Sequence, residues 1–236
     1  CWLRDAYYSL AAFRLLGHYE EREQFLQFLL NIAASTPDLD LAPLYRIDGT
    51  CDLEEKILTH WAGYNCDGPV RIGNGAALHK QHDIFGEMVL ALTPIFLDER
   101  FKHERSAATL DLIERLARKA ISVAGSPDAG IWEYRTEWKP QAFSSLMCWA
   151  ACDRMALVAS QHKKAHESEF REHATRLREA LLAASWNPKL GSLVATEGSD
   201  ELDASLLQAV TLRLLPRNDP RMHGTVDAIA KGLSHA

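Results

Sequence analysis

A tryptophan stands directly before a glutamate in a break between two helical patterns. Trp132 and Glu133 lie in residues 126–135, where Pro127 and Gly130 interrupt helix formation. A carboxyl group against an indole ring loses part of its hydration, which raises its pKa and suits it to donate a proton near neutral pH. The pair is therefore a candidate general acid, although an anchored ring beside a solvated carboxylate would show the same two residues.

A second group of chemically useful side chains lies at the start of the chain. Trp2, Arg4 and Asp5 put an indole, a guanidinium and a carboxylate within four positions at the start of a predicted helix. Such a set suits a sugar, because the ring offers an apolar face and the charged groups bond hydroxyls. The local alternative is a helix cap, in which Asp5 bonds first-turn amides and Arg4 pairs with it.

Metal and nucleophile chemistry find less support. His79 and His82 are three apart on a predicted helix, but no HExxH motif or Cys/His partner set accompanies them. We interpret them as part of a solvated face and expect no metal and no cofactor. Ser144 and Ser145 begin a predicted helix without a GxSxG motif, so we interpret them as caps. None of the five cysteines is marked as activated.

Periodicity predicts an all-α protein. Apolar helices tend to alternate with amphipathic ones, which is typical of a barrel of helical hairpins with function in its long loops. A plain helical bundle would show the same periodicity, whereas the lack of a fixed-period repeat argues against a solenoid. A short hairpin is expected near residues 190–196, and Pro94 should kink or end its helix. The eight predicted helices are residues 6–16, 21–34, 76–97, 107–124, 143–159, 167–184, 203–214 and one from Asp219 onward.

Composition restricts the partners. The net charge is −6 and no block of Lys and Arg occurs, which argues against nucleic acid. No apolar run of membrane-spanning length and no signal peptide is evident, so we expect no membrane partner. Cys148 and Cys152 are interpreted as buried free thiols, which favours a reducing cytoplasm. The chain begins at Cys1 without an initiator Met, and we expect it to be truncated at both ends.

Several segments, taken in order, resemble glycoside hydrolase family 15, the glucoamylase-like and trehalase-like enzymes. Each motif alone is a weak indication of the family, whereas the whole set in this order is specific for it. They are Trp2-Leu3-Arg4-Asp5, Pro43-Leu44-Tyr45-Arg46-Ile47-Asp48-Gly49, Gly63-Tyr64, residues 69–74, Asp83-Ile84-Phe85-Gly86-Glu87, Gly130-Ile131-Trp132-Glu133, Met147-Cys148-Trp149-Ala150 with Asp153-Arg154, Leu202-Asp203-Ala204-Ser205-Leu206-Leu207 and Asp219-Pro220-Arg221.

The resemblance implies that residues 1–236 are one partial (α/α)6-barrel catalytic domain of the six-hairpin glycosidase type. It implies an inverting, exo-acting hydrolase that releases glucose from the non-reducing end of an α-glucan or oligosaccharide, or from trehalose, with two carboxyl groups. Glu133 matches the general acid of the family. The residues implied to bind glucose are Trp2, Arg4 and Asp5, with Arg71, Asn74 and Trp132 added by position.

Departures from the family pattern leave other readings open. The family's general base lies on a later segment, beyond residue 236, so the fragment alone is expected to be inactive. His79 stands where Gln is expected, and Phe143-Ser144-Ser145 replaces a Tyr-Ser-Lys-like pattern, which leaves the cleaved linkage undecided. One alternative is a catalytically silent carbohydrate-binding or regulatory α/α domain. Another is a sugar lyase or epimerase with a His or Tyr base. The oligomeric state is not determined by the sequence.

Overall fold

The computed structural model describes residues 1–234 and confirms the all-α prediction. Eight α-helices account for most of the ordered backbone in this range, and its strands are six two-residue pieces. The chain divides into two compact units, Cys1–Lys80 and Gln81–Ala236, which are described separately below.

The first unit begins with two helices joined by a tight turn. Helix α1 (Leu3–Leu16) ends at Gly17, whose left-handed φ of 82° lets the chain turn into α2 (Tyr19–Ala34). The sequence places the start of α1 at Ala6, three residues late. The first turn is fixed instead by pairing outside the helix, since Trp2 forms an isolated bridge with Leu44.

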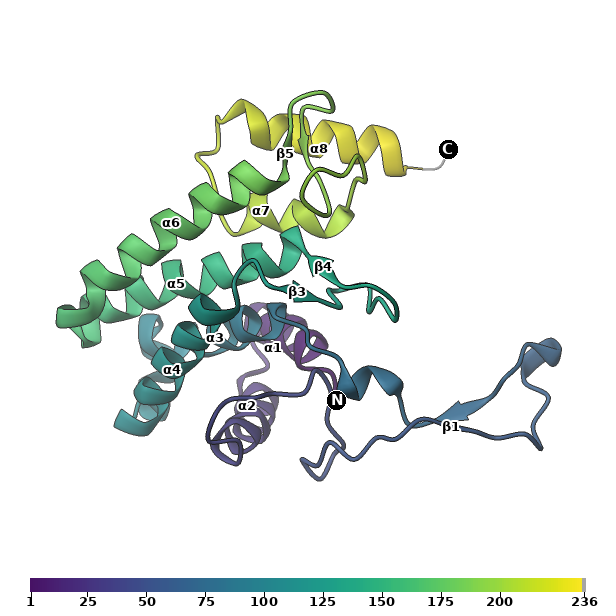
Figure 1. Ribbon diagram of the computed structural model, residues 1–236. Helices are drawn as coiled ribbons and strands as arrows, with labels where there is room; N and C mark the ends of the chain where they lie inside the picture. The colour runs from purple at the N-terminus through teal and green to yellow at the C-terminus, as the bar shows by residue number, and fades with distance from the viewer. Residues whose placement is uncertain (235–236) are drawn as a thin grey trace. The chain divides into compact units, whose positions relative to one another are not determined.

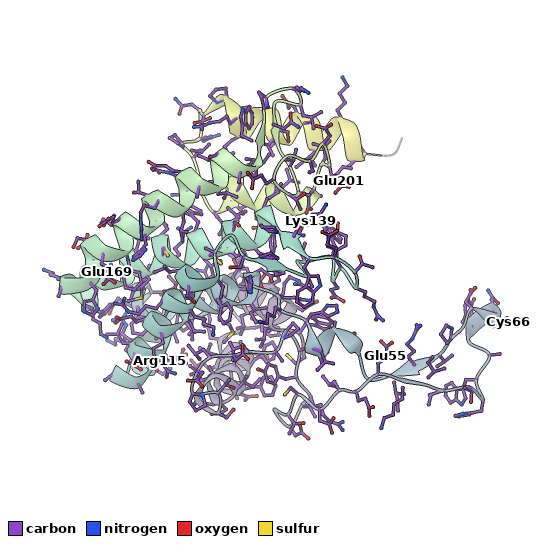
Figure 2. All side chains as sticks on the ribbon, in the orientation of Figure 1. Glu55, Cys66, Arg115, Lys139, Glu169 and Glu201 are labelled. Carbon is purple, nitrogen blue, oxygen red and sulfur yellow. The ribbon has the colours of Figure 1, made fainter. Side chains whose placement is uncertain are left out.

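The remainder of the first unit is irregular and carries a projecting arm, residues 53–74. Strands β1 (Lys56–Ile57) and β2 (Arg71–Ile72) pair antiparallel along it, and the 3₁₀ helix η1 (Tyr64–Cys66) forms its tip. Figure 1 shows the arm extending away from α1 and α2, and Figure 2 shows Cys66 at its far end. The 3₁₀ helix η2 (Gly75–Leu78) follows.

The predicted helix at 76–97 is wrong over residues 76–82. Asn74 caps the short η2 with its side chain, the chain becomes extended at His79, and α3 (Asp83–Leu97) begins only at Asp83. His79 and His82 therefore do not share an α-helical face, and the predicted solvated face is wrong for His82, which is buried. Pro94 lies inside α3, which ends one turn later, in agreement with the predicted ending.

The second unit is built on four long helices. Helix α5 (Ala142–His162) packs on α3, on α4 (Ala107–Val123) and on α6 (Glu167–Ser185), an arrangement visible in Figure 1. The backbones of α3 and α5 touch, because a Cβ added to Gly86 would lie 2.2 Å from the carbonyl oxygen of Met147. Short 3₁₀ helices η3 (Glu99–Glu104) and η4 (Lys164–His166) precede α4 and α6.

Helix α5 corrects one expectation from the sequence. Within residues 1–234 it is the one helix that is long and apolar enough to cross a membrane by length and composition, and 78% of its apolar window is buried inside the structure. Three packed neighbours explain this composition, since a helix covered on several sides is apolar around most of its circumference.

The second unit ends in shorter elements. Strands β5 (Trp186–Asn187) and β6 (Ser192–Leu193) form the expected hairpin. The predicted helix at 203–214 is divided into a 3₁₀ helix, η5 (Ala204–Leu207), and a single α-turn, α7 (Gln208–Thr211), and it stops short of Leu214 because Arg213 turns left-handed at φ 62°. Asp219 caps α8 (Pro220–Leu233), with Pro220 in its first turn, as predicted.

Candidate active site

Trp132 and Glu133 lie in a hairpin loop, residues 129–138, which we call the acid loop. Strands β3 (Pro127–Asp128) and β4 (Lys139–Pro140) pair antiparallel at its base. Inside it, the N–H of Tyr134 donates to the carbonyl of Ala129 at 3.0 Å, and the N–H of Glu133 to that of Gly130 at 3.2 Å. The predicted break between helices is therefore an ordered turn.

Glu133 has an unusual backbone conformation at the end of this turn. Its φ is 57°, in the left-handed region that non-glycine residues rarely occupy, and its side chain is half-buried. A left-handed non-glycine residue costs about 1–2 kcal/mol and persists where its surroundings fix it, which is common at active sites. The turn therefore presents this carboxyl from a constrained backbone.

Asp128 anchors the base of the acid loop to two helices of the second unit. Its carboxyl is fully buried, and Oδ2 accepts from the backbone N–H of His82 at 2.9 Å and from the hydroxyl of Ser144 at 2.7 Å. Burial raises the pKa of Asp128 to about 6; the two hydrogen bonds lower it and the nearby carboxyl of Asp83 raises it further. Ser144 is thus not a cap, and the N-cap of α5 is Gln141 without a side-chain bond.

Trp132 is held through its ring nitrogen. The indole N–H donates to Oδ2 of Asp203 at 3.0 Å, while Oδ1 of Asp203 accepts from the backbone N–H of Ser205 at 2.8 Å. Asp203 is 5% exposed, whereas Trp132 is 56% exposed. One edge of the indole is therefore fixed, and much of the ring surface is open.

In the first unit, the predicted residues at the start of α1 have different surroundings. Arg4 is buried, and its guanidinium carbon lies 5.8 Å from the centroid of the Trp2 ring, within cation–π range. Asp5 is exposed in the first helical turn, where the helix dipole favours a negative charge. No side-chain bond from Trp2 caps α1.

Arg71 and Asn74 lie near the base of the arm, in a segment that Glu55 contacts at two points. Nε of Arg71 lies 3.2 Å from Oε1 of Glu55, and the N–H of Gly75 donates to Oε2 at 3.2 Å. Asn74 caps η2 by accepting from the N–H of Ala76 at 2.9 Å. Both side chains thus have structural partners, and their contact with a sugar stays a prediction.

The predicted site residues therefore form three local groups. Trp132 and Glu133 share the acid loop, Trp2 with its two charged neighbours shares the start of α1, and Arg71 shares the arm with Asn74. Sequence reasoning missed Asp128 and Asp203 as supports of the acid loop. The only sequence signal was each residue's place before a turn or a short helix, where an aspartate is expected as a cap.

The buried cysteines are not activated nucleophiles. All five cysteines are free, and Cys148 and Cys152 are buried as predicted. Burial raises the pKa of the Cys152 thiol to about 12, and the pKa of Cys148 is raised for the same reason. A thiol rather than a thiolate occupies both positions near neutral pH, which excludes attack by either sulfur.

Known proteins resemble this chain over nearly its full length. It is 37% identical to a trehalase of Mycolicibacterium smegmatis over 99% of the chain, and 30% identical to a trehalase of Thermoplasma volcanium over 98%. These alignments span 35% and 36% of the two trehalases, so the chain corresponds to about a third of such relatives.

Solved structures identify the fold. A wild-type glycosidase superposes with a TM-score of 0.71 at 17% identity, covering 98% of this chain and 60% of that one. A bacterial glucoamylase complexed with acarbose superposes with a TM-score of 0.67 at 16% identity, covering 98% of this chain and 33% of that one. The glucoamylase has an (α/α)6 barrel, and this chain forms part of that fold, as predicted.

The family is identified independently of the fold. The model described as glycosyl hydrolases family 15 matches residues 1–236. Because that match runs from the first residue to the last, the chain belongs to glycosyl hydrolases family 15.

Proposed function

We propose that the protein carrying this chain hydrolyses an α-glucosidic bond with inversion, acting on a terminal glucosyl residue, with Glu133 as general acid. The observation that carries the proposal is the acid loop, where a constrained glutamate follows a ring fixed by Asp203. Family membership and relatives named trehalases support a glucoside substrate, with trehalose as the first to test and α-glucans or oligosaccharides next.

The mechanism assigns Glu133 the proton that the leaving oxygen needs. Its carboxylic acid protonates the glycosidic oxygen while water attacks the anomeric carbon from the opposite face, and a second carboxylate takes the proton of that water. We propose that this base comes from outside residues 1–236. In the first unit, we propose that glucose contacts are made by Trp2, Arg4, Asp5, Arg71 and Asn74. In the second unit, the ring of Trp132 is the proposed contact.

Replacing Glu133 tests the acid role. Glu133→Gln keeps the size of the side chain but cannot donate the proton, so kcat on trehalose should fall by about 10²–10⁴-fold while KM changes little. The measurement is glucose release by the full-length protein. Glu137→Gln, an exposed position of the same loop, is the matched control and should retain activity. Near-normal turnover by Glu133→Gln would show the assignment to be wrong.

The configuration of the product tests inversion. Inverting cleavage of trehalose releases one β-glucose and one α-glucose, whereas retention releases only α-glucose. Early time points by proton NMR, before mutarotation, distinguish the two. A full-length protein that binds these sugars without cleaving trehalose, maltose, isomaltose or starch would instead support the silent carbohydrate-binding domain.

A further inference from the structure

The two oxygens of Asp203 serve two different elements. Oδ1 accepts from the N–H of Ser205 and so caps η5, and Oδ2 accepts from the indole N–H of Trp132, 71 residues earlier in the chain. The carboxylate is 5% exposed. A buried, charged acceptor forms stronger hydrogen bonds than a neutral one, so this contact is well suited to hold a ring.

A helix cap alone does not account for this arrangement. Many side chains can cap a short 3₁₀ helix, and Asn would do so as well as Asp. A carboxylate presents two acceptor oxygens and no donor, so Asp203 accepts from the helix start with Oδ1 and from the indole with Oδ2, whereas Asn would place its own NH2 group against one of these two N–H groups. The second bond goes to a ring that remains 56% exposed, which packing in the core does not explain.

The neighbouring anchor has a different effect. Asp128 bonds the main chain of His82 and the side chain of Ser144, and therefore fixes the base of the acid loop. It does not bond the indole. Rotation of the Trp132 ring about its side-chain torsions is thus opposed by Asp203, at the edge of the ring that carries its nitrogen.

We propose that Asp203 is a positioning residue that holds the indole of Trp132 as a stacking platform for the terminal glucosyl residue. The proposal rests on the function proposed above and extends it to the support of the substrate-binding ring. Because stacking acts on the bound sugar before and during the reaction, loss of the platform weakens binding more than it slows the chemical step.

A double-mutant cycle separates positioning from general stability. Asp203→Asn has one acceptor oxygen where the wild type has two, so one of its two bonds is lost. Trp132→Phe keeps an aromatic ring but removes the N–H. Each single variant should raise KM for trehalose about tenfold, the equivalent of one hydrogen bond to a charged group, with kcat within about threefold. The double variant should resemble Trp132→Phe, because the pair acts as one unit.

Asp219→Asn is the matched control for capping. Asp219 caps α8 by accepting from the N–H of Arg221 at 2.9 Å and contacts no indole, so KM should stay at the wild-type value. If Asp203→Asn raises KM by the same factor with and without the Trp132 indole, or if Asp219→Asn raises it as much, Asp203 does not act through the ring.

A spectroscopic readout is independent of turnover. In the full-length protein labelled with 5-fluorotryptophan, the ¹⁹F resonance of Trp132 is the one that Trp132→Phe removes. Asp203→Asn should shift or broaden that resonance and leave the other tryptophan resonances in place. Glucose should shift the Trp132 resonance in the wild type, with an affinity that Asp203→Asn lowers about tenfold. An unchanged Trp132 resonance in Asp203→Asn, or one that glucose leaves unaffected in the wild type, refutes the proposal. A protein that cleaves no glucoside, yet passes both spectral tests, refutes only the hydrolase function.

Discussion

Asp128 shows how a single buried carboxyl can be retained without a cation. Its oxygen Oδ2 accepts two hydrogen bonds, but burial dominates and holds the pKa of Asp128 at about 6, above its usual 3.8. The groups that face it are Asp83 on α3 and the Cys148 thiol and Ser144 hydroxyl on α5. The residue is therefore protonated in mildly acidic solution and ionised at neutral pH.

This pKa predicts a pH-dependent stability. A raised carboxyl pKa means that the folded state binds the proton more tightly than the unfolded state, so the contribution is fully present below about pH 4 and is lost as pH rises through about 6. The free energy of unfolding of the wild type minus that of Asp128→Ala should fall by about 2 kcal/mol from pH 4 to pH 7. Urea unfolding across that range measures it.

The control for this titration is a surface aspartate. Asp227→Ala, at an exposed position of α8, should give a difference from the wild type that is nearly constant over the same pH range. A difference between wild type and Asp128→Ala that stays flat, or rises with pH, would contradict the burial argument.

At the scale of the element, the acid loop depends on Gly130. Its φ of 63° lies in the left-handed region, and a Cβ there would lie 2.7 Å from Cγ of Gln141. Gly125, just before β3, has a similar φ of 73° but open space around it. Substitutions at these two glycines therefore allow the cost of backbone strain to be separated from the cost of crowding.

We therefore predict that Gly130→Ala is more harmful than Gly125→Ala. Gly125→Ala should cost about 1–2 kcal/mol of unfolding free energy through its left-handed backbone. Gly130→Ala should cost about 1–3 kcal/mol more, since Gln141 must move, and should also lower kcat because the turn that carries Glu133 shifts. Urea unfolding and glucose release measure the two effects. Equal losses in both variants would mean that Gln141 adapts at no cost.

At the scale of the whole molecule, the second unit is organised around the contact of α3 with α5. Gly86 allows it, because any side chain there meets the backbone of Met147 rather than a movable side chain. The single barrel domain expected over residues 1–236 stays a prediction, and the two units carry separate groups of site residues.

Gly86→Ala should accordingly destabilise the second unit severely. The two helices must separate to admit a Cβ, which we expect to cost about 3 kcal/mol or more, at the upper end of the range for overpacking. Gly232→Ala is the helical control, because its Cβ meets only the flexible end of Leu202. That variant should be neutral or stabilising, since Ala favours helix over Gly. Thermal unfolding of both variants would check this, and similar midpoints would be inconsistent with a backbone contact at Gly86.

Local sequence signals were enough to predict much of the secondary structure of this protein. The 3.6-residue apolar period and the caps at Gly17 and Asp219 specified an all-α chain, with helix α4 predicted to within a residue. Pro127 and Gly130 marked the break that holds Trp132 and Glu133. The prediction failed where a side chain caps a short 3₁₀ helix, as at Asn74, because a 3₁₀ turn and the first turn of an α-helix carry the same capping signal.

Only the tertiary structure decided which groups support the acid loop. The bonds of Asp203 to Trp132 and of Asp128 to Ser144 join residues 71 and 16 positions apart. No periodicity encodes such contacts, because they exist only when η5 and α5 pack beside the loop. The sequence alone predicts that Asp203 and Ser144 are both helix caps. In the structure, Asp203 also binds the indole of Trp132, and Ser144 binds the buried carboxyl of Asp128.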